Sequence, residues 1–208
     1  MKSPVNPRTS ASDLMVNIRK GDKISFTQLY SKIAPAFKMF CCGIVCESDV
    51  GERIFERAFS ELWPIRLHLT SLYTVKGQLY ERCGKICMYF KQLMEERAVS
   101  VTEVDSLPWP DDYALSPEQR VAVDIRVVHT ETINNLREGL ERISPLLRKI
   151  VQLTWKGETD QEIARRLKIP EAMVKTLLAE ALAAMNDAGQ ADRAPLVSFL
   201  KGRRNPYQ

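Results

Sequence analysis

Residues 159–182 have the sequence TDQEIARRLKIPEAMVKTLLAEAL, a pattern of two short helices joined by a tight turn. Asp160 is placed to cap the first helix, and Lys168-Ile169 is the expected turn. Pro170 suits the first position of the second helix, because its missing N–H costs nothing there. The apolar residues of the two helices are Ile163, Ala164 and Leu167, then Met173, Val174, Leu177, Leu178, Ala181 and Leu182. The segment predicts a helix-turn-helix, the device that places a helix in the DNA major groove.

The overall composition fits one or two small domains with real cores. The chain has 208 residues, of which 45% are hydrophobic. The formal net charge is +4, which is compatible with contact to nucleic acid but does not demand it. No apolar run is long enough to span a membrane, and residues 1–12 lack the apolar core of a signal peptide. We therefore expect a cytoplasmic protein.

The spacing of apolar residues predicts helices along most of the remaining chain. We expect a short helix from Asp13, a second helix after Gly21-Asp22, a third from Ser48 to Trp63 and a long one over residues 79–97. Residues 65–77 are expected to form a loop. Two further helices should begin at Ser116-Pro117 and Ser144-Pro145. No strand pattern is convincing, so the predicted fold class is all-α, with two small helical domains.

The composition changes between the two helical regions. Residues 98–119 contain three prolines, five acidic residues and no lysine or arginine, which is typical of an extended acidic linker. The predicted organisation is a disordered N-terminus at 1–12, a helical domain at 13–97, the linker at 98–119, a helix-turn-helix domain at 120–188 and a basic tail at 189–208.

The five cysteines leave two interpretations open. Cys42 and Cys46 are four residues apart, as are Cys83 and Cys87, so each pair would share one face of a helix. If the two helices pack together, the four thiolates would suit a zinc ion. We favour the plainer interpretation, that the cysteines are small buried apolar residues, because the tight C-x-x-C spacing is absent. We expect no metal and no other cofactor.

The order of these segments resembles bacterial sigma factors of the extracytoplasmic-function (ECF) type, which consist of two helical domains called region 2 and region 4. The similarity is most specific at residues 143–148 (ISPLLR), 155–164 (WKGETDQEIA) and 169–175 (IPEAMVK). A weaker similarity covers residues 25–30 (SFTQLY) and 58–63 (AFSELW), in region 2. The resemblance implies a promoter-specificity subunit of RNA polymerase, without catalytic activity of its own.

The resemblance also implies where the partners bind. Core RNA polymerase would contact the helix at residues 49–63, through Arg53, Glu56, Phe59, Leu62 and Trp63. Melted promoter DNA would contact residues 64–91, whose cationic and aromatic side chains suit a single strand. These side chains are Arg66, His68, Tyr73, Lys76, Tyr80, Arg82 and Lys85, although the two tyrosines also fit a partly buried role. In the helix-turn-helix, the expected DNA contacts are Arg165, Arg166, Lys168, Lys175 and Thr176.

Departures from the family pattern leave the source of promoter choice open. Arg53 and Glu56 stand where the family has an acidic residue and a glutamine, and Leu177 and Glu180 stand where its recognition helix commonly has arginines. Residues 170–185 have a formal charge of −1, so this helix should bind DNA weakly on its own. A partner, such as an activator or an RNA-guided DNA-binding complex, would then supply the targeting. An anti-sigma factor is a further expected partner.

One alternative remains open for the whole chain and one for the linker. Instead of a sigma factor, the chain would be a helix-turn-helix regulator or adaptor that does not engage core polymerase. In the family, the linker threads the nucleic-acid channel of the polymerase, and Asp105, Asp111 and Asp112 would suit such a basic channel. Acidic composition is also typical of a disordered tether.

Overall fold

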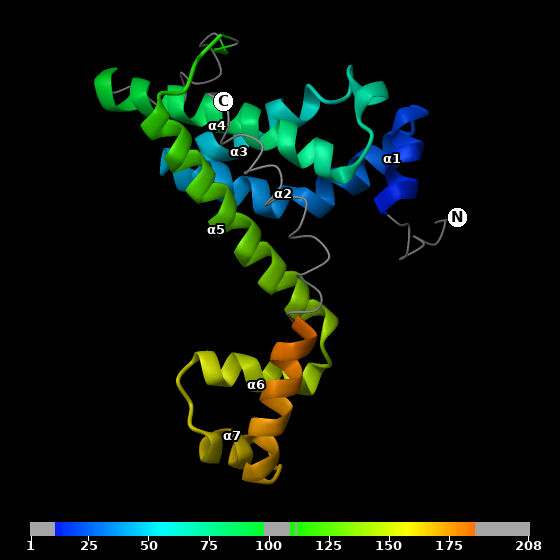
Figure 1. Cartoon of the computed structure of the whole chain (residues 1–208), viewed down its shortest axis with the longest axis vertical. Helices are drawn as coiled ribbons and strands as arrows, with labels where there is room; N and C mark the ends of the chain where they lie inside the picture. The colour runs from blue at the N-terminus through cyan, green and yellow to red at the C-terminus, as the bar shows by residue number, and fades with distance from the viewer. Residues whose placement is uncertain (1–10, 98–108, 111, 186–208) are drawn as a thin grey trace, which may run out of the picture. The chain divides into compact units, whose positions relative to one another are not determined.

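The computed structural model describes residues 11–97, 109–110 and 112–185, and every regular element within them is helical (Figure 1). The elements are α1 (Ala11–Arg19), α2 (Lys23–Val45), α3 (Ser48–Ser60), the 3-10 helix η1 (Arg66–His68), α4 (Leu72–Arg97), α5 (Pro117–Arg142), α6 (Pro145–Trp155) and α7 (Asp160–Leu167). A further helix covers residues 171–185. The predicted all-α fold class is confirmed. None of the described helices is long and apolar enough to cross a membrane.

The chain divides into two compact units, residues 1–130 (unit 1) and 131–208 (unit 2). The division falls inside α5, which gives its first half to unit 1 and its second half to unit 2. The domain bounds expected from composition, with a linker at 98–119, stay a prediction. The expectations for the disordered N-terminus, for Asp105 and Asp111 and for the basic tail fall on residues 1–10, 98–108, 111 and 186–208, outside the described residues.

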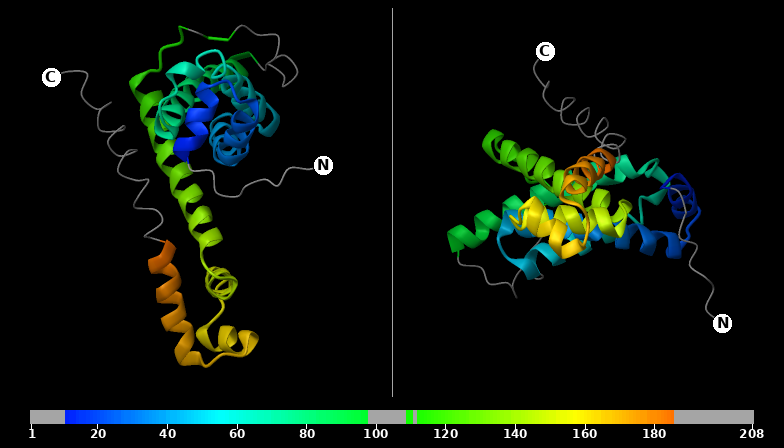
Figure 2. Two further views of the ribbon diagram at one scale, coloured as in Figure 1. Left: turned by 90° about the vertical axis from the view of Figure 1, so that its right-hand side faces the viewer. Right: turned by 90° about the horizontal axis from the view of Figure 1, so that it is seen from below.

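Unit 1 is built around α2, which contacts α1, α3 and α4. These four helices gather into one bundle in the two views of Figure 2. Aromatic rings fill the space between them: Tyr80 of α4 stacks on Phe37 with 4.2 Å between ring centroids and meets Phe40 edge-to-face at 4.9 Å. Phe55 of α3 joins the same cluster through Phe37. Buried rings of this size dominate the energetics of a small core.

The first helix boundaries lie where the sequence predicts them. Gly21 has φ +90°, a left-handed conformation that glycine adopts without cost. The Asp22 carboxylate then caps α2 by accepting hydrogen bonds from the N–H groups of Ile24 at 3.0 Å and Ser25 at 3.2 Å. A hydrogen bond from the Ser25 hydroxyl, together with these two bonds, lowers the pKa of Asp22. The predicted break between a short first helix and a second helix is confirmed.

The prediction of a loop at residues 65–77 is wrong for most of these residues. Residues 66–68 form η1, and α4 begins at Leu72, seven residues before the predicted start at residue 79. The Ser71 hydroxyl accepts a hydrogen bond from the N–H of Thr74 at 3.1 Å and thereby caps the helix. The threonine and glycine content of this stretch suggested a loop, but the serine cap and the burial of Val75 decide the local structure.

Within unit 1, the first half of α5 packs closely against α2 and α4 at two glycines. A side chain at Gly84 of α4 would collide with Val123, and one at Gly43 of α2 would collide with the guanidinium of Arg126. Arg126 donates a hydrogen bond to the carbonyl oxygen of Gly43, which belongs to the last turn of α2. The two glycines therefore provide the space in which α5 lies against the bundle.

Unit 2 holds its helices around two small apolar clusters. One joins Ile143, Leu147 and Val151 to Ala181 and Met185 of the last helix. The other is formed by Ile150, Leu153, Ile163, Ala164 and Val174. At Gly139 of α5, an added Cβ would lie 3.2 Å from Met185, so the last helix passes close to α5 at this crossing.

Candidate nucleic-acid interface

The predicted helix-turn-helix is present in unit 2, with one correction at its start. Thr159, and not Asp160, caps α7: its hydroxyl accepts a hydrogen bond from the N–H of Glu162, and its own N–H donates to the Glu162 carboxylate at 2.7 Å. The reciprocal pair is a capping box, which satisfies two backbone donors instead of one. The N–H and hydroxyl of Thr159 stabilise the charged carboxylate and lower the pKa of Glu162.

The turn between the two helices follows the prediction. Lys168 adopts a left-handed conformation with φ +56°, and its N–H donates to the carbonyl oxygen of Ala164. The N–H of Ile169 donates to the same carbonyl at 3.1 Å. Bonds of this kind close the C-terminus of a helix and redirect the chain. The helix at 171–185 then packs Val174 into the core beside Ala164.

The outward face of the helix at 171–185 carries few polar groups. Opposite the buried Val174 and Ala181, helical periodicity places Ala172, Thr176, Ala179 and Ala183, all exposed. The Thr176 hydroxyl lies 3.5 Å from the carbonyl oxygen of Ala172. Lys175 is exposed beside this face, and its Nζ lies 3.9 Å from an Asp160 carboxylate oxygen. Such an exposed pair is weak, so Lys175 can exchange Asp160 for a phosphate.

Three further cations expected to contact DNA surround the turn. Arg165, Arg166 and Lys168 are all exposed. One guanidinium nitrogen of Arg166 lies 3.1 Å from the Glu158 carboxylate, and both residues line a polar cleft of about 440 Å³ with Glu162 and Arg165. A phosphate contact by Arg166 would therefore compete with Glu158.

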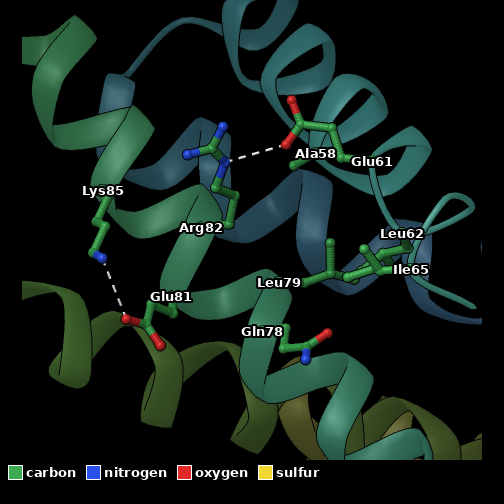
Figure 3. A pocket seen from close by; sticks show the side chains of 9 residues that line it. All are labelled: Ala58, Glu61, Leu62, Ile65, Gln78, Leu79, Glu81, Arg82 and Lys85. Carbon is green, nitrogen blue, oxygen red and sulfur yellow. Dashed lines mark hydrogen bonds and ion pairs between the residues drawn. The ribbon is translucent and has the colours of Figure 1, made fainter. Parts of the chain in front are cut away.

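A second candidate site lies between α3 and α4 in unit 1, on the segment expected to meet melted DNA (Figure 3). It is a pocket of about 340 Å³ with a floor of Ala58, Leu62, Ile65 and Leu79. Its polar lining consists of Glu61, Gln78, Glu81, Arg82 and Lys85. The volume is within the range typical of small-molecule pockets, roughly 300–1,000 Å³.

The two cations of this pocket are held by carboxylates. Nε of Arg82 lies 3.2 Å from Glu61, and Nζ of Lys85 lies 3.3 Å from Glu81. Figure 3 marks both pairs with dashed lines, Arg82 with Glu61 and Lys85 with Glu81. Partly exposed pairs of this kind contribute little to stability and exchange readily. The pocket therefore combines an apolar floor with cations that can turn to an incoming anion.

The remaining residues expected to contact melted DNA are divided between surface and core. The prediction that Tyr80 contacts DNA is wrong. Its side chain is only 1% exposed and stacks inside the bundle, so it is not available to a base. His68 is exposed, whereas Tyr73 and Lys76 are half-buried. Arg66 stacks over the Trp63 ring at 4.9 Å and donates a hydrogen bond to the carbonyl oxygen of Trp63 at 3.2 Å.

The residues expected to bind polymerase also differ in accessibility. Phe59 and Leu62 are each 4% exposed, and Phe59 stacks on Phe26 with 4.5 Å between ring centroids. Their side chains belong to the core of unit 1. Glu56 is exposed on α3 and accepts hydrogen bonds from Tyr30 and from Lys38. Arg53 and Trp63 are half-buried.

The four cysteines that suggested a zinc site differ in burial. Cys83 and Cys87 are completely buried, whereas Cys42 is half-buried and Cys46 is exposed. It is Cys41 that interacts with Cys83 and Cys87. Burial raises the pKa of Cys41 and Cys87, whereas the hydrogen bond with Cys41, together with burial, raises the pKa of Cys83. Within residues 11–97, 109–110 and 112–185, no group of three or more potential metal ligands is found.

Sequence reasoning missed two contributions to these surfaces. Glu61 and Glu81 hold the pocket cations, and the spacing of Glu81 and Lys85 was the available signal for one of the pairs. Trp109, in the expected linker, stacks on Arg57 of α3 with 4.2 Å between the guanidinium carbon and the ring centroid. No pattern in the acidic stretch indicated that contact.

Comparison with known proteins gives a family match in the C-terminal unit. A search of curated proteins gave no match for the chain. Residues 133–185 match the model of the family described as Sigma-70, region 4. The matched residues begin in the second half of α5 and end with the helix at 171–185, so they include the whole helix-turn-helix. Within the C-terminal unit, residues 133–185 are therefore similar to sigma-70 region 4.

Proposed function

We propose that the chain is a sigma factor of the ECF type, which binds core RNA polymerase and directs initiation at specific promoters. The observation that carries the proposal is the sigma-70 region 4 match, because it coincides with a capped helix-turn-helix. The helical unit that precedes it supports the proposal, since ECF factors place region 2 before region 4. Transcription would be catalysed by the polymerase, with this chain supplying recognition.

In this proposal, α3 is the helix that core polymerase contacts. The accessible side chains of Arg53 and Glu56 would form the contact, while Phe59 and Leu62 hold α3 against α2 from inside. Core-facing residues of this kind position a binding helix without touching the partner. Substitution of Phe59 or Leu62 would therefore report on folding, and Arg53 and Glu56 are the informative positions.

The pocket between α3 and α4 would receive an unpaired base of the melted promoter. A flipped base needs an apolar cavity for its faces and polar groups at its edge, and the pocket offers Leu62 and Leu79 with Gln78 and Arg82. The neighbouring phosphates would draw Lys85 and Arg82 from their carboxylate partners. The helix-turn-helix would hold the upstream duplex through Arg165, Arg166, Lys168 and Lys175.

Mixing the full chain with core polymerase tests the proposal directly. We expect co-elution in gel filtration at micromolar concentration and transcripts with a defined start site. Arg53→Ala should weaken co-elution, whereas Lys32→Ala, which removes an exposed positive charge from α2, should not. Absence of any complex would favour the alternative of a helix-turn-helix regulator or adaptor that does not engage polymerase.

A second version of the function is favoured by the outward face of the helix at 171–185. Ala172, Thr176, Ala179 and Ala183 offer a single hydroxyl for base recognition, and Lys175 is the helix's only cation. Promoter choice would then come from a partner, such as an activator or an RNA-guided complex, that delivers the factor to DNA. In a gel-shift assay, tight sequence-specific binding by the polymerase complex alone would contradict this version.

A further inference from the structure

Two aromatic residues of the expected linker cover part of the surface shared by α3 and α4. Trp109 lies on Arg57 of α3, with 4.2 Å between the guanidinium carbon and the ring centroid. Tyr113 meets Tyr89 of α4 edge-to-face, with 5.5 Å between ring centroids. The Tyr113 hydroxyl also donates a hydrogen bond to the side-chain oxygen of Gln92 at 2.9 Å. Two aromatic side chains therefore occupy a surface of unit 1 that α3 and α4 would otherwise expose.

The covered residues continue the row that lines the pocket. Gln78, Arg82 and Lys85 recur at intervals of four and three residues and so share one face of α4, and all three line the pocket (Figure 3). Tyr89 and Gln92 extend the same series. At a rise of about 1.5 Å per residue, Tyr89 lies roughly 6 Å beyond Lys85 along the helix. The pocket and the surface under Tyr113 are thus neighbours on one face.

The contacts of Trp109 and Tyr113 have the chemistry of nucleobase stacking. A flat ring on a guanidinium and a ring against a tyrosine are the contacts by which proteins hold single strands without reading their sequence. Asp112, between the two aromatic residues, is exposed and carries negative charge as a phosphate does. The segment therefore presents rings and a carboxylate where a strand would present bases and a phosphate.

We propose that Arg57, Tyr89 and Gln92 form a second binding site for single-stranded DNA, beside the pocket, which Trp109 and Tyr113 occupy in the free chain. The proposal rests on the proposed function for the source of the strand, which is the melted promoter. A strand that enters the pocket would continue along α4 and displace the two rings. The end of the linker then acts as a competitor that leaves when DNA binds.

Anisotropy of a fluorescein-labelled oligothymidylate, titrated with the full chain, tests the site. Trp109→Ala removes the competitor and should tighten binding about threefold to tenfold. Arg57→Ala in the Trp109→Ala background should then weaken binding about fivefold or more, the effect of losing one stacked base. Lys32→Ala in the same background is the matched control, because it removes one exposed charge from α2, away from the row. Circular dichroism checks that each variant is folded.

A second measurement follows Trp109 itself. In a Trp63→Phe and Trp155→Phe chain, Trp109 is the remaining tryptophan, and oligothymidylate should increase its quenching by acrylamide as the ring leaves Arg57. Tyr113→Phe, which removes the hydrogen bond to Gln92 and retains the ring, should increase quenching before DNA is added.

The outcomes separate this site from the function of the chain. If Trp109→Ala leaves the affinity for oligothymidylate unchanged or lowers it, or if Arg57→Ala and Lys32→Ala weaken binding equally, the second site is refuted. Co-elution with core polymerase is scored on the same chains. A chain that binds oligothymidylate as described and never co-elutes keeps the second site and refutes the sigma-factor proposal. A chain that co-elutes with core polymerase and initiates transcription, but shows none of these effects on oligothymidylate binding, supports the sigma-factor proposal and refutes the second site.

Discussion

Gly51 allows α3 to lie directly against the backbone of α2, and a single methyl group there should disturb both candidate sites of unit 1. A Cβ added at Gly51 would lie 2.6 Å from the backbone nitrogen of Cys42 and 2.8 Å from its Cα. Ordinary contact begins at 3.4 Å, so Gly51→Ala requires α3 to retreat by about 3.4 − 2.6 = 0.8 Å. The obstacle is backbone, which cannot rotate away as a side chain can.

Two opposing terms determine the stability of Gly51→Ala. Alanine in a helix interior gains roughly 1 kcal/mol over glycine. Overpacking of a tight core costs about 1–3 kcal/mol and occasionally more, and a backbone clash belongs at the upper end. We therefore expect a net loss of about 1–2 kcal/mol in the free energy of unfolding of unit 1. The shift of α3 should also change the pocket, of which Ala58 and Leu62 form one wall.

Urea denaturation, followed by Trp63 fluorescence in a Trp109→Phe and Trp155→Phe chain, measures the effect on unit 1. Gly84→Ala is the matched control, because Gly84 is another buried helical glycine of unit 1 whose added Cβ meets the side chain of Val123 at 2.8 Å. The obstacle at Gly84 is a side chain and not backbone, so Gly84→Ala should cost less than Gly51→Ala. Equal stability of the two variants, or a Gly51→Ala chain as stable as the parent, would refute the reasoning.

Three further predictions concern the caps and the pocket. Thr159→Ala removes the capping box of α7 and should cost unit 2 about 1 kcal/mol in urea denaturation followed by Trp155 fluorescence. The folded-state pKa of Glu162 is lowered below the ordinary 4.5, so its contribution is complete above about pH 4.5 and is lost as pH falls through the folded pKa. Glu162→Gln should therefore flatten the acid side of the stability curve of unit 2, and an unchanged curve contradicts this. Glu61→Gln weakens the hold on Arg82 and should tighten oligothymidylate binding, with a change in unfolding free energy below about 1 kcal/mol because the pair is partly exposed.

Helix positions and the apolar core were predictable because they depend on local chemistry. Asp22, Ser48 and Ser144 mark helix starts in the sequence, and each lies at or beside the start of a helix in the structure. At residue 159 the local signals conflicted: both Thr159 and Asp160 can cap, and the capping box with Glu162 decides for Thr159. At α4 the conflict was between composition and a cap. The threonine and glycine content of residues 65–77 suggested a loop, whereas the Ser71 cap starts the helix at Leu72.

The candidate sites were less predictable, because residue type does not reveal which way a side chain points. Tyr80 and Tyr73 lie seven residues apart in one helix, yet Tyr80 is core and Tyr73 is half-buried at the surface. The pairing of Arg82 with Glu61 connects two helices and depends on how they pack. Contact between Trp109 and Arg57 spans an even longer separation, and nothing in the acidic composition around Trp109 requires it.

The distribution of chemistry between the units bears on how such a factor would find its promoters. In the helix at 171–185, three of the four outward positions are alanine, so base-edge readout has one hydroxyl and the neighbouring Lys175 to use. The face of α4 has, in contrast, an amide, a guanidinium, an ammonium group and a tyrosine ring in one row, beside a pocket. Stacking and phosphate contacts in such a row hold a strand after it has been opened, but they do not choose a duplex. Sequence choice would then depend on which bases fit the pocket, or on a partner that brings the chain to the DNA before melting.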